Sequence, residues 1–64
     1  MKDYGKALRK ILDENGCAFV RHGRGDHDVW ENPASGRRFA VPVKIRSRHL
    51  ANKILKEAGL EKAF

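Results

Sequence analysis

The fold is decided by residues 17–43, which read CAFVRHGRGDHDVWENPASGRRFAVPV. Three short runs of apolar residues alternating with polar ones are separated by two four-residue stretches. These stretches are rich in glycine, proline, aspartate and serine, the residues that favour tight turns. The sequence therefore predicts three antiparallel strands joined by loops at 23–26 and 33–36. The expected strands are 17–22, 28–32 and 37–43.

Two pairs of opposite charge support one register of these strands. With four-residue loops, Arg21 lies opposite Asp28 across the first hairpin. Glu31 lies opposite Arg38 across the second. The bulkier face of the sheet then collects Cys17, Phe19, Trp30, Phe39 and Val41. The other face collects Val20, His22, His27, Val29 and Ala40. We expect the bulkier face to pack on the helices and His27 to lie on or beside the open face, although a shift of one residue would reverse this assignment.

A helix is expected on each side of the strands, and each ends at a glycine. The first extends from an N-cap at Asp3 to Asn15, before Gly16. Its stripe of residues at helical spacing consists of Tyr4, Leu8, Ile11, Leu12 and Asn15, with Ala7 at the edge. The second begins after an N-cap at Ser47 and ends at Gly59. Its stripe consists of Leu50, Ala51, Ile54, Leu55 and Ala58. The order α-β-β-β-α predicts an α+β two-layer sandwich.

Length and composition limit the class of protein. The 64 residues are 41% hydrophobic and 34% charged, which is typical of one small globular domain covering residues 1–64. The first ten residues, MKDYGKALRK, lack the apolar run of a secretory signal, and no apolar stretch is long enough to cross a membrane. The single cysteine, Cys17, argues against an internal disulfide or a multi-cysteine zinc site. We therefore expect a cytoplasmic protein.

The charge balance indicates an anionic partner. Fourteen lysines and arginines stand against eight acidic residues, which gives a net charge of +6. In so small a domain this favours nucleic acid and, less often, an acidic protein. The alternative is a basic surface that only keeps the protein soluble.

The stretch HGRGDHDVW places a histidine beside a basic hairpin loop. An imidazole can move a proton near neutral pH, since its ordinary pKa is about 6.5. Arg24 can hold a phosphate, while Gly23 and Gly25 let the phosphate approach backbone N–H groups. His27 and this loop would then form a minimal phosphodiesterase site. The alternative is that His27 is simply a polar residue where a hairpin ends.

A second candidate anion site precedes the second helix. Arg46, Ser47 and Arg48 lie at its expected N-terminus, where backbone N–H groups attract anions. An ordinary capped helix with solvated charges explains the same residues equally well.

The remaining histidines are weaker candidates. His22 faces His27 in the expected hairpin, and with Asp26 the pair could bind a metal, but two solvated histidines are favoured. His49 is expected to be a surface or capping residue. We predict no metal site and no cofactor.

Several segments together resemble the HicA family of small bacterial toxins. They are NGC (15–17), VRHGRGDHDVW (20–30), GRRFAVP (36–42) and SRHLANKILKEAGL (47–60). The resemblance implies a fold like that of double-stranded-RNA-binding domains and metal-independent cleavage of mRNA that blocks translation. It also implies His27 as the key residue and a HicB-like antitoxin as the partner.

The sequence departs from the family pattern at two positions. Asp26 stands where the family commonly has serine, and Lys44 stands where many members have a histidine after the strand-three proline. A lysine at that position can stabilise a phosphate but is a poor proton carrier. The leading hypothesis is an endoribonuclease toxin in which Arg24, Lys44 and the N-terminus of the second helix hold phosphate. The alternatives are an RNA-binding module without catalysis and an inactive toxin that still binds its antitoxin or operator.

Overall fold

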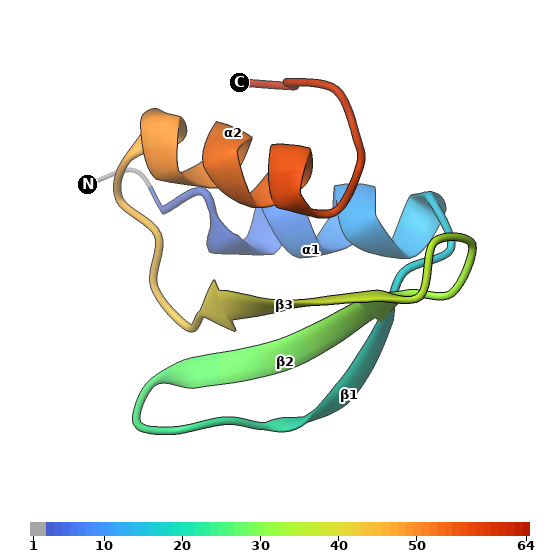
Figure 1. Ribbon diagram of the computed structural model, residues 1–64. Coiled ribbons are helices and arrows are strands. Elements are labelled where there is room, and N and C mark those ends of the chain that lie inside the picture. The colour runs from blue at the N-terminus through green and yellow to red at the C-terminus, as the bar shows by residue number, and fades with distance from the viewer. Residues whose placement is uncertain (1–2) are drawn as a thin grey trace.

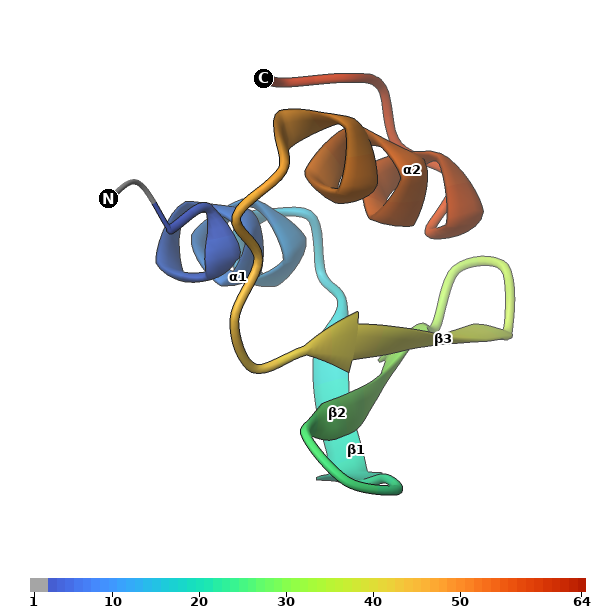
Figure 2. The same ribbon diagram turned by 90° about the vertical axis from the view of Figure 1, so that its left-hand side faces the viewer.

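A computed structural model describes residues 3–64 and confirms the predicted α-β-β-β-α order. The elements are α1 (Gly5–Glu14), β1 (Ala18–His22), β2 (His27–Asn32), β3 (Arg37–Pro42) and α2 (Arg48–Glu57). The three strands form one antiparallel sheet in the order β1-β2-β3. Both helices lie on the same side of this sheet, which makes two layers (Figure 1). The hairpin of β1 and β2 extends away from the helices (Figure 2).

Both helices end as the sequence predicts. Gly16 has a φ of 82°, in the left-handed region that favours glycine. The N–H of Cys17 donates to the carbonyl of Leu12 at 2.9 Å, which closes the last turn of α1. α2 ends in the same way at Gly59, and Ser47 is confirmed as its N-cap. Gly16 thus turns the chain from α1 into the sheet, and Gly59 turns it from α2 into the C-terminal tail.

The register of the sheet is confirmed for one hairpin and wrong for part of the other. Between β2 and β3 it is as predicted, and Glu31 pairs with Arg38 at 3.5 Å. Between β1 and β2 a β-bulge interrupts the ladder after Phe19. It shifts the pairing by one residue, so His22 and not Arg21 lies opposite Asp28. The predicted pair of Arg21 with Asp28 is therefore wrong.

The core lies between the helices and the sheet. Its buried apolar residues are Leu8, Leu12, Cys17, Trp30, Phe39, Val41, Ile45, Ala51, Ile54, Leu55 and Ala58. Most residues predicted for the bulkier face of the sheet are therefore buried against the helices, as expected. Phe19 is the exception, with 46% of its surface exposed, because β1 is an edge strand and extends beyond the helices. Leu50 was expected on the apolar stripe of α2 but is 37% exposed. Burial raises the pKa of the Cys17 thiol, which fits a core residue and not a nucleophile.

The carboxylate of Asp3 joins α1 to the segment that follows β3. It accepts hydrogen bonds from the N–H groups of Gly5 (2.8 Å) and Ile45 (3.1 Å), residues 40 positions apart in the chain. These two bonds, and then the positive charges of Arg9 and Arg46, hold the pKa of Asp3 below its ordinary value. The N-cap of α1 is nevertheless Tyr4, so the N-cap expected at Asp3 is wrong. Asp3 instead bonds to the N–H of the first helical residue and serves as a tertiary contact.

Replacing Asp3 with asparagine should lower the free energy of unfolding at neutral pH. It should also make that free energy depend less on pH in the acid range. A carboxyl whose pKa is lowered by folding stabilises the native state above its unfolded pKa, about 3.9. That contribution is lost as the pH falls through the lower folded pKa. Urea unfolding of wild type and Asp3→Asn from pH 7 to pH 2 should show curves that differ at pH 7 and converge in acid. A constant difference at every pH would contradict the role of the charge.

Asn32 is the buried polar residue that connects the sheet to α2. Its Nδ2 donates to the carbonyl of Ala58 at 2.8 Å, and its Oδ1 accepts from the N–H of Ala34 at 3.1 Å. One side chain therefore satisfies a carbonyl at the end of α2 and an amide in the loop after β2. No pattern in the sequence marks Asn32, because its partner Ala58 is distant in the chain.

Asn32→Ala should lower the free energy of unfolding by about 1–3 kcal/mol, because it leaves a buried carbonyl without a donor. Urea denaturation followed by circular dichroism measures this loss. Asn15→Ala is the matched control, since Asn15 makes its hydrogen bond to the Ile11 carbonyl at an exposed position. Equal effects of the two substitutions would show that the burial of Asn32 does not matter.

Candidate functional site

The loop between β1 and β2 and the connection between β3 and α2 lie at the same end of the molecule (Figure 1). The N–H of Val43 donates to the carbonyl of Asp26 at 2.6 Å, which joins the two segments directly. Beside this contact is a pocket of about 270 Å³, lined by Asp26, Pro42, Val43 and Lys44. Lys44 is thus brought against the hairpin loop, although 17 positions separate it from His27 in the sequence.

The connection that carries Lys44 is held by α1 although it has no regular structure. The guanidinium of Arg9 donates to the carbonyl of Val43 at 2.9 Å. Ile45 is fully buried in the core. Lys44 lies between these two anchored residues and is itself exposed. Its backbone position is therefore fixed while its ammonium group faces solvent.

His27 is the first residue of β2 and lies on the face of the sheet opposite the helices, as predicted. It is exposed and pairs with Pro42 of β3. Its backbone closes the turn, with its N–H donating to the Arg24 carbonyl (3.2 Å) and its carbonyl accepting from Gly23 (2.7 Å). The turn thus fixes the backbone of His27 and leaves the imidazole available to a ligand.

The hairpin loop presents a cation and accessible backbone at the same place. Arg24 and Gly25 are both exposed, and Gly25 has a φ of 58°, which an L side chain rarely adopts. His27 and Arg24 are therefore next to each other around one tight turn. Such an arrangement can bind a phosphate group and move a proton beside it.

Arg46, Ser47 and Arg48 are exposed at the start of α2 and lie further along the same connection. The Oγ of Ser47 accepts a hydrogen bond from the N–H of Leu50 at 3.4 Å, so this hydroxyl already acts as a cap. No acidic residue occupies the first turn of α2. In Figure 1 this segment lies at the same end of the molecule as the hairpin loop, close to the helices and away from the tip of the hairpin.

The expected pairing of His22 with His27 is wrong. Because of the β-bulge, His22 lies opposite Asp28 and shares its face of the sheet, whereas His27 lies on the other face. The Nδ1 of His22 is 2.9 Å from Oδ1 of Asp28. Within residues 3–64 no three side chains of histidine, cysteine, aspartate or glutamate gather as metal ligands.

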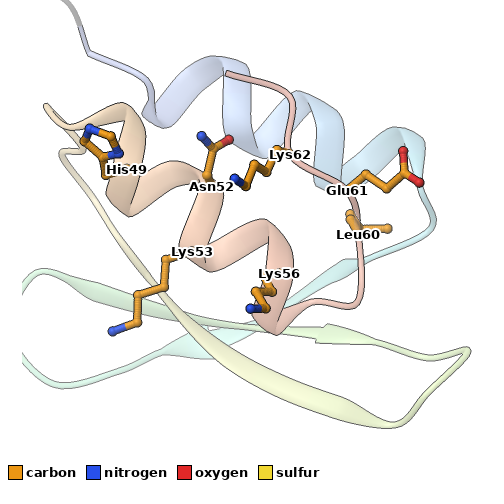
Figure 3. Close-up of a pocket in the computed structure, with 7 residues that line it drawn as sticks. All are labelled: His49, Asn52, Lys53, Lys56, Leu60, Glu61 and Lys62. Atoms are coloured by element: carbon orange, nitrogen blue, oxygen red, sulfur yellow. The ribbon is translucent and has the colours of Figure 1, made fainter.

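A larger pocket of about 470 Å³ lies between α2 and the C-terminal tail, away from the hairpin (Figure 3). Its lining residues are His49, Asn52, Lys53, Lys56, Leu60, Glu61 and Lys62. The tail is held because Asn52 exchanges two hydrogen bonds with the backbone of Phe64, at 3.0 and 3.1 Å. The three lysines of this pocket, Lys53, Lys56 and Lys62, are all exposed.

Comparison with known proteins identifies one family. The family model described as the HicA toxin of bacterial toxin–antitoxin systems matches residues 5–60, from the start of α1 to just beyond α2. Neither the curated proteins nor the solved structures include a match. None of the helices in the described part of the chain is long and apolar enough to span a membrane.

Proposed function

Because the chain belongs to the HicA family of bacterial toxins, we propose that it is the endoribonuclease of a toxin–antitoxin pair. In this proposal it cleaves mRNA without a metal ion and so blocks translation. The observation that carries the proposal is the exposed imidazole of His27 at the end of a basic hairpin turn. The fixed backbone of Lys44 beside the same loop supports the proposal over the alternative of an ordinary polar hairpin end.

The proposed chemistry uses the ribose as its own nucleophile. The 2′-oxygen attacks phosphorus, the bond to the 5′-oxygen breaks, and the products are a 2′,3′-cyclic phosphate and a 5′-hydroxyl. His27 either takes the proton of the 2′-hydroxyl or gives a proton to the leaving 5′-oxygen. Arg24, Lys44 and the backbone at Gly25 stabilise the charge that develops on the phosphate oxygens. Arg46, Ser47 and Arg48 hold a neighbouring phosphate of the same strand.

A HicA toxin has a cognate antitoxin, and we propose that the antitoxin here is a HicB-like protein. The net charge of +6 suits an acidic partner as well as RNA. An antitoxin that covers the open face around His27 would exclude mRNA from the same surface.

The second candidate function is RNA binding without cleavage. It is favoured by the two exposed basic segments, which lie at one end of the fold and can contact backbone phosphates without any proton transfer. The two functions differ in whether the RNA is broken, so one assay separates them.

His27→Ala should abolish growth arrest and lower the rate of RNA cleavage by a factor on the order of 10² to 10⁴. The rate is measured on a random-sequence RNA pool in the presence of EDTA. If cleavage needed a divalent ion, wild type would not cleave the RNA under these conditions. His49→Ala is the matched control because it removes an exposed histidine outside the hairpin. Growth arrest by folded His27→Ala at the wild-type level would rule out His27 as the catalyst.

Arg24→Gln should weaken the binding of several unrelated RNAs by a similar factor, and Arg48→Gln should do the same. A side chain that only neutralises a phosphate adds affinity without sequence preference, and its loss lowers the salt slope of binding by about one unit. Both are made in a His27→Ala background, so that the probe is not cleaved.

Lys56→Gln is the control for this comparison, since it removes the same charge at the far end of α2. Salt titrations of all four proteins give the slopes. If the Arg24 and Arg48 variants behave like the background protein, these side chains do not contact RNA.

A further inference from the structure

Arg21 lies on the same face of the hairpin as His27, and it has no part in the proposed function as stated so far. The β-bulge is the cause, because it shifts the partner of Arg21 in the ladder from Asp28 to Val29. Val29 and His27 are two residues apart in β2, so their side chains share one face of the sheet. Both helices cover the other face (Figure 1), so Arg21 and His27 lie together on the open surface.

Arg21 and His27 are diagonal neighbours on this face. In an antiparallel pair of strands, a residue lies about 7–8 Å from the one two positions away from its partner, which is within reach of a long side chain. The guanidinium of Arg21 extends toward the loop, since its Nη1 donates to the carbonyl of His22 at 3.4 Å. The side chain is therefore directed toward the end of the hairpin where His27 lies.

Gly23 leaves room for a ligand between these two side chains. Its N–H donates to the carbonyl of His27 at 2.7 Å, so Gly23 lies opposite His27 in the hairpin. A Cβ on Gly23 would lie 3.4 Å from Cγ2 of Val29, so it would point to the open face. The φ of Gly23 is not positive, and what glycine contributes here is the absence of a side chain. The open face therefore has an unfilled position that Arg21, Val29 and His27 border.

The charge of Arg21 is available to an anion. Its side chain is exposed, and across the described chain it forms no salt bridge with a carboxylate. Asp28, its expected partner, lies on the other face and pairs with His22. Arg38 also lies on the open face but is paired with Glu31 at 3.5 Å. Arg21 thus differs from Arg38 in having no acidic neighbour that neutralises it.

We propose that Arg21 binds the scissile phosphate in the RNA cleavage, with the phosphate lying over Gly23 between Arg21 and His27. This inference rests on the proposed function. The guanidinium donates two N–H groups to the non-bridging oxygens and stays protonated throughout. Its charge stabilises the negative charge that develops on these oxygens while His27 moves a proton. Arg21 contacts the phosphate from β1, whereas Arg24 and Lys44 contact it from the two loops.

The test is single-turnover cleavage of a random-sequence RNA pool with the protein in saturating excess. The rate then reports the chemical step and not the affinity for RNA. Arg21→Gln should lower this rate by a factor of about 10² to 10³, as the loss of one donor to a developing oxyanion does. Arg21→Lys keeps the charge but not the paired N–H groups, so its rate should lie between the two. Neither variant should change the shape of the pH profile, because Arg21 transfers no proton.

Arg38→Gln is the matched control, because it removes an arginine from the same face at a greater distance from His27. Its partner Glu31 is four residues after His27 in β2, and loss of this exposed pair costs little stability. The rate of Arg38→Gln should equal that of wild type.

The outcomes keep this inference separate from the proposed function. A wild-type rate for folded Arg21→Gln, with activity lost in His27→Ala, would overturn the inference and keep the proposed function. Equal losses in Arg21→Gln and Arg38→Gln would also overturn it, because the effect would then come from the general charge of the face. Absence of cleavage by wild type would overturn both.

Discussion

The β-bulge after Phe19 determines which side chains each face of the hairpin presents. In an uninterrupted ladder, His22 and His27 would lie together on the open face, and Arg21 would pair with Asp28. The extra residue moves the side chains at the end of β1 to the opposite face of the sheet, whereas those before the bulge keep their face. As a result the hairpin carries one imidazole on each face, and the carboxylate of Asp28 pairs with that of His22.

The division of the molecule into a packed part and an exposed part follows from its size. The core is enclosed by the two helices, β3 and the first part of the hairpin, while the end of the hairpin extends beyond it. That end is nevertheless attached to the rest, because Val43 bonds to Asp26 and Arg9 bonds to Val43. α1 therefore influences the position of the loop through two hydrogen bonds, from the Arg9 side chain to Val43 and from Val43 to Asp26, although it supplies no residue of the candidate site.

Sequence patterns predicted the parts of the structure that depend on local chemistry. Both helices were predicted from the helical spacing of their apolar residues, from the glycines that end them and from the Ser47 cap. The register of the second hairpin was predicted from the opposite charges of Glu31 and Arg38. The bulge could not be predicted, because CAFVRH alternates equally well in either register. Asn32 and Asn52 were missed for another reason. The side-chain N–H group of each donates to a carbonyl that is distant in the chain, and no local pattern marks such a contact.

The same limits apply to the candidate site. His27 and Arg24 could be identified because one turn brings them together, and Lys44 was identified only through the family resemblance. The pairing of His22 with Asp28 depends on a shift of one residue in the ladder, so it became visible only with the structure.

The buried thiol of Cys17 gives the molecule a built-in probe of its own opening. It lies where α1 ends and the sheet begins, it is 3% exposed, and burial raises its pKa. A thiol reagent attacks the thiolate, so it has to wait until the helix layer separates from the sheet. The rate at which Cys17 is labelled therefore reports how often the two layers come apart, without any added dye or engineered cysteine.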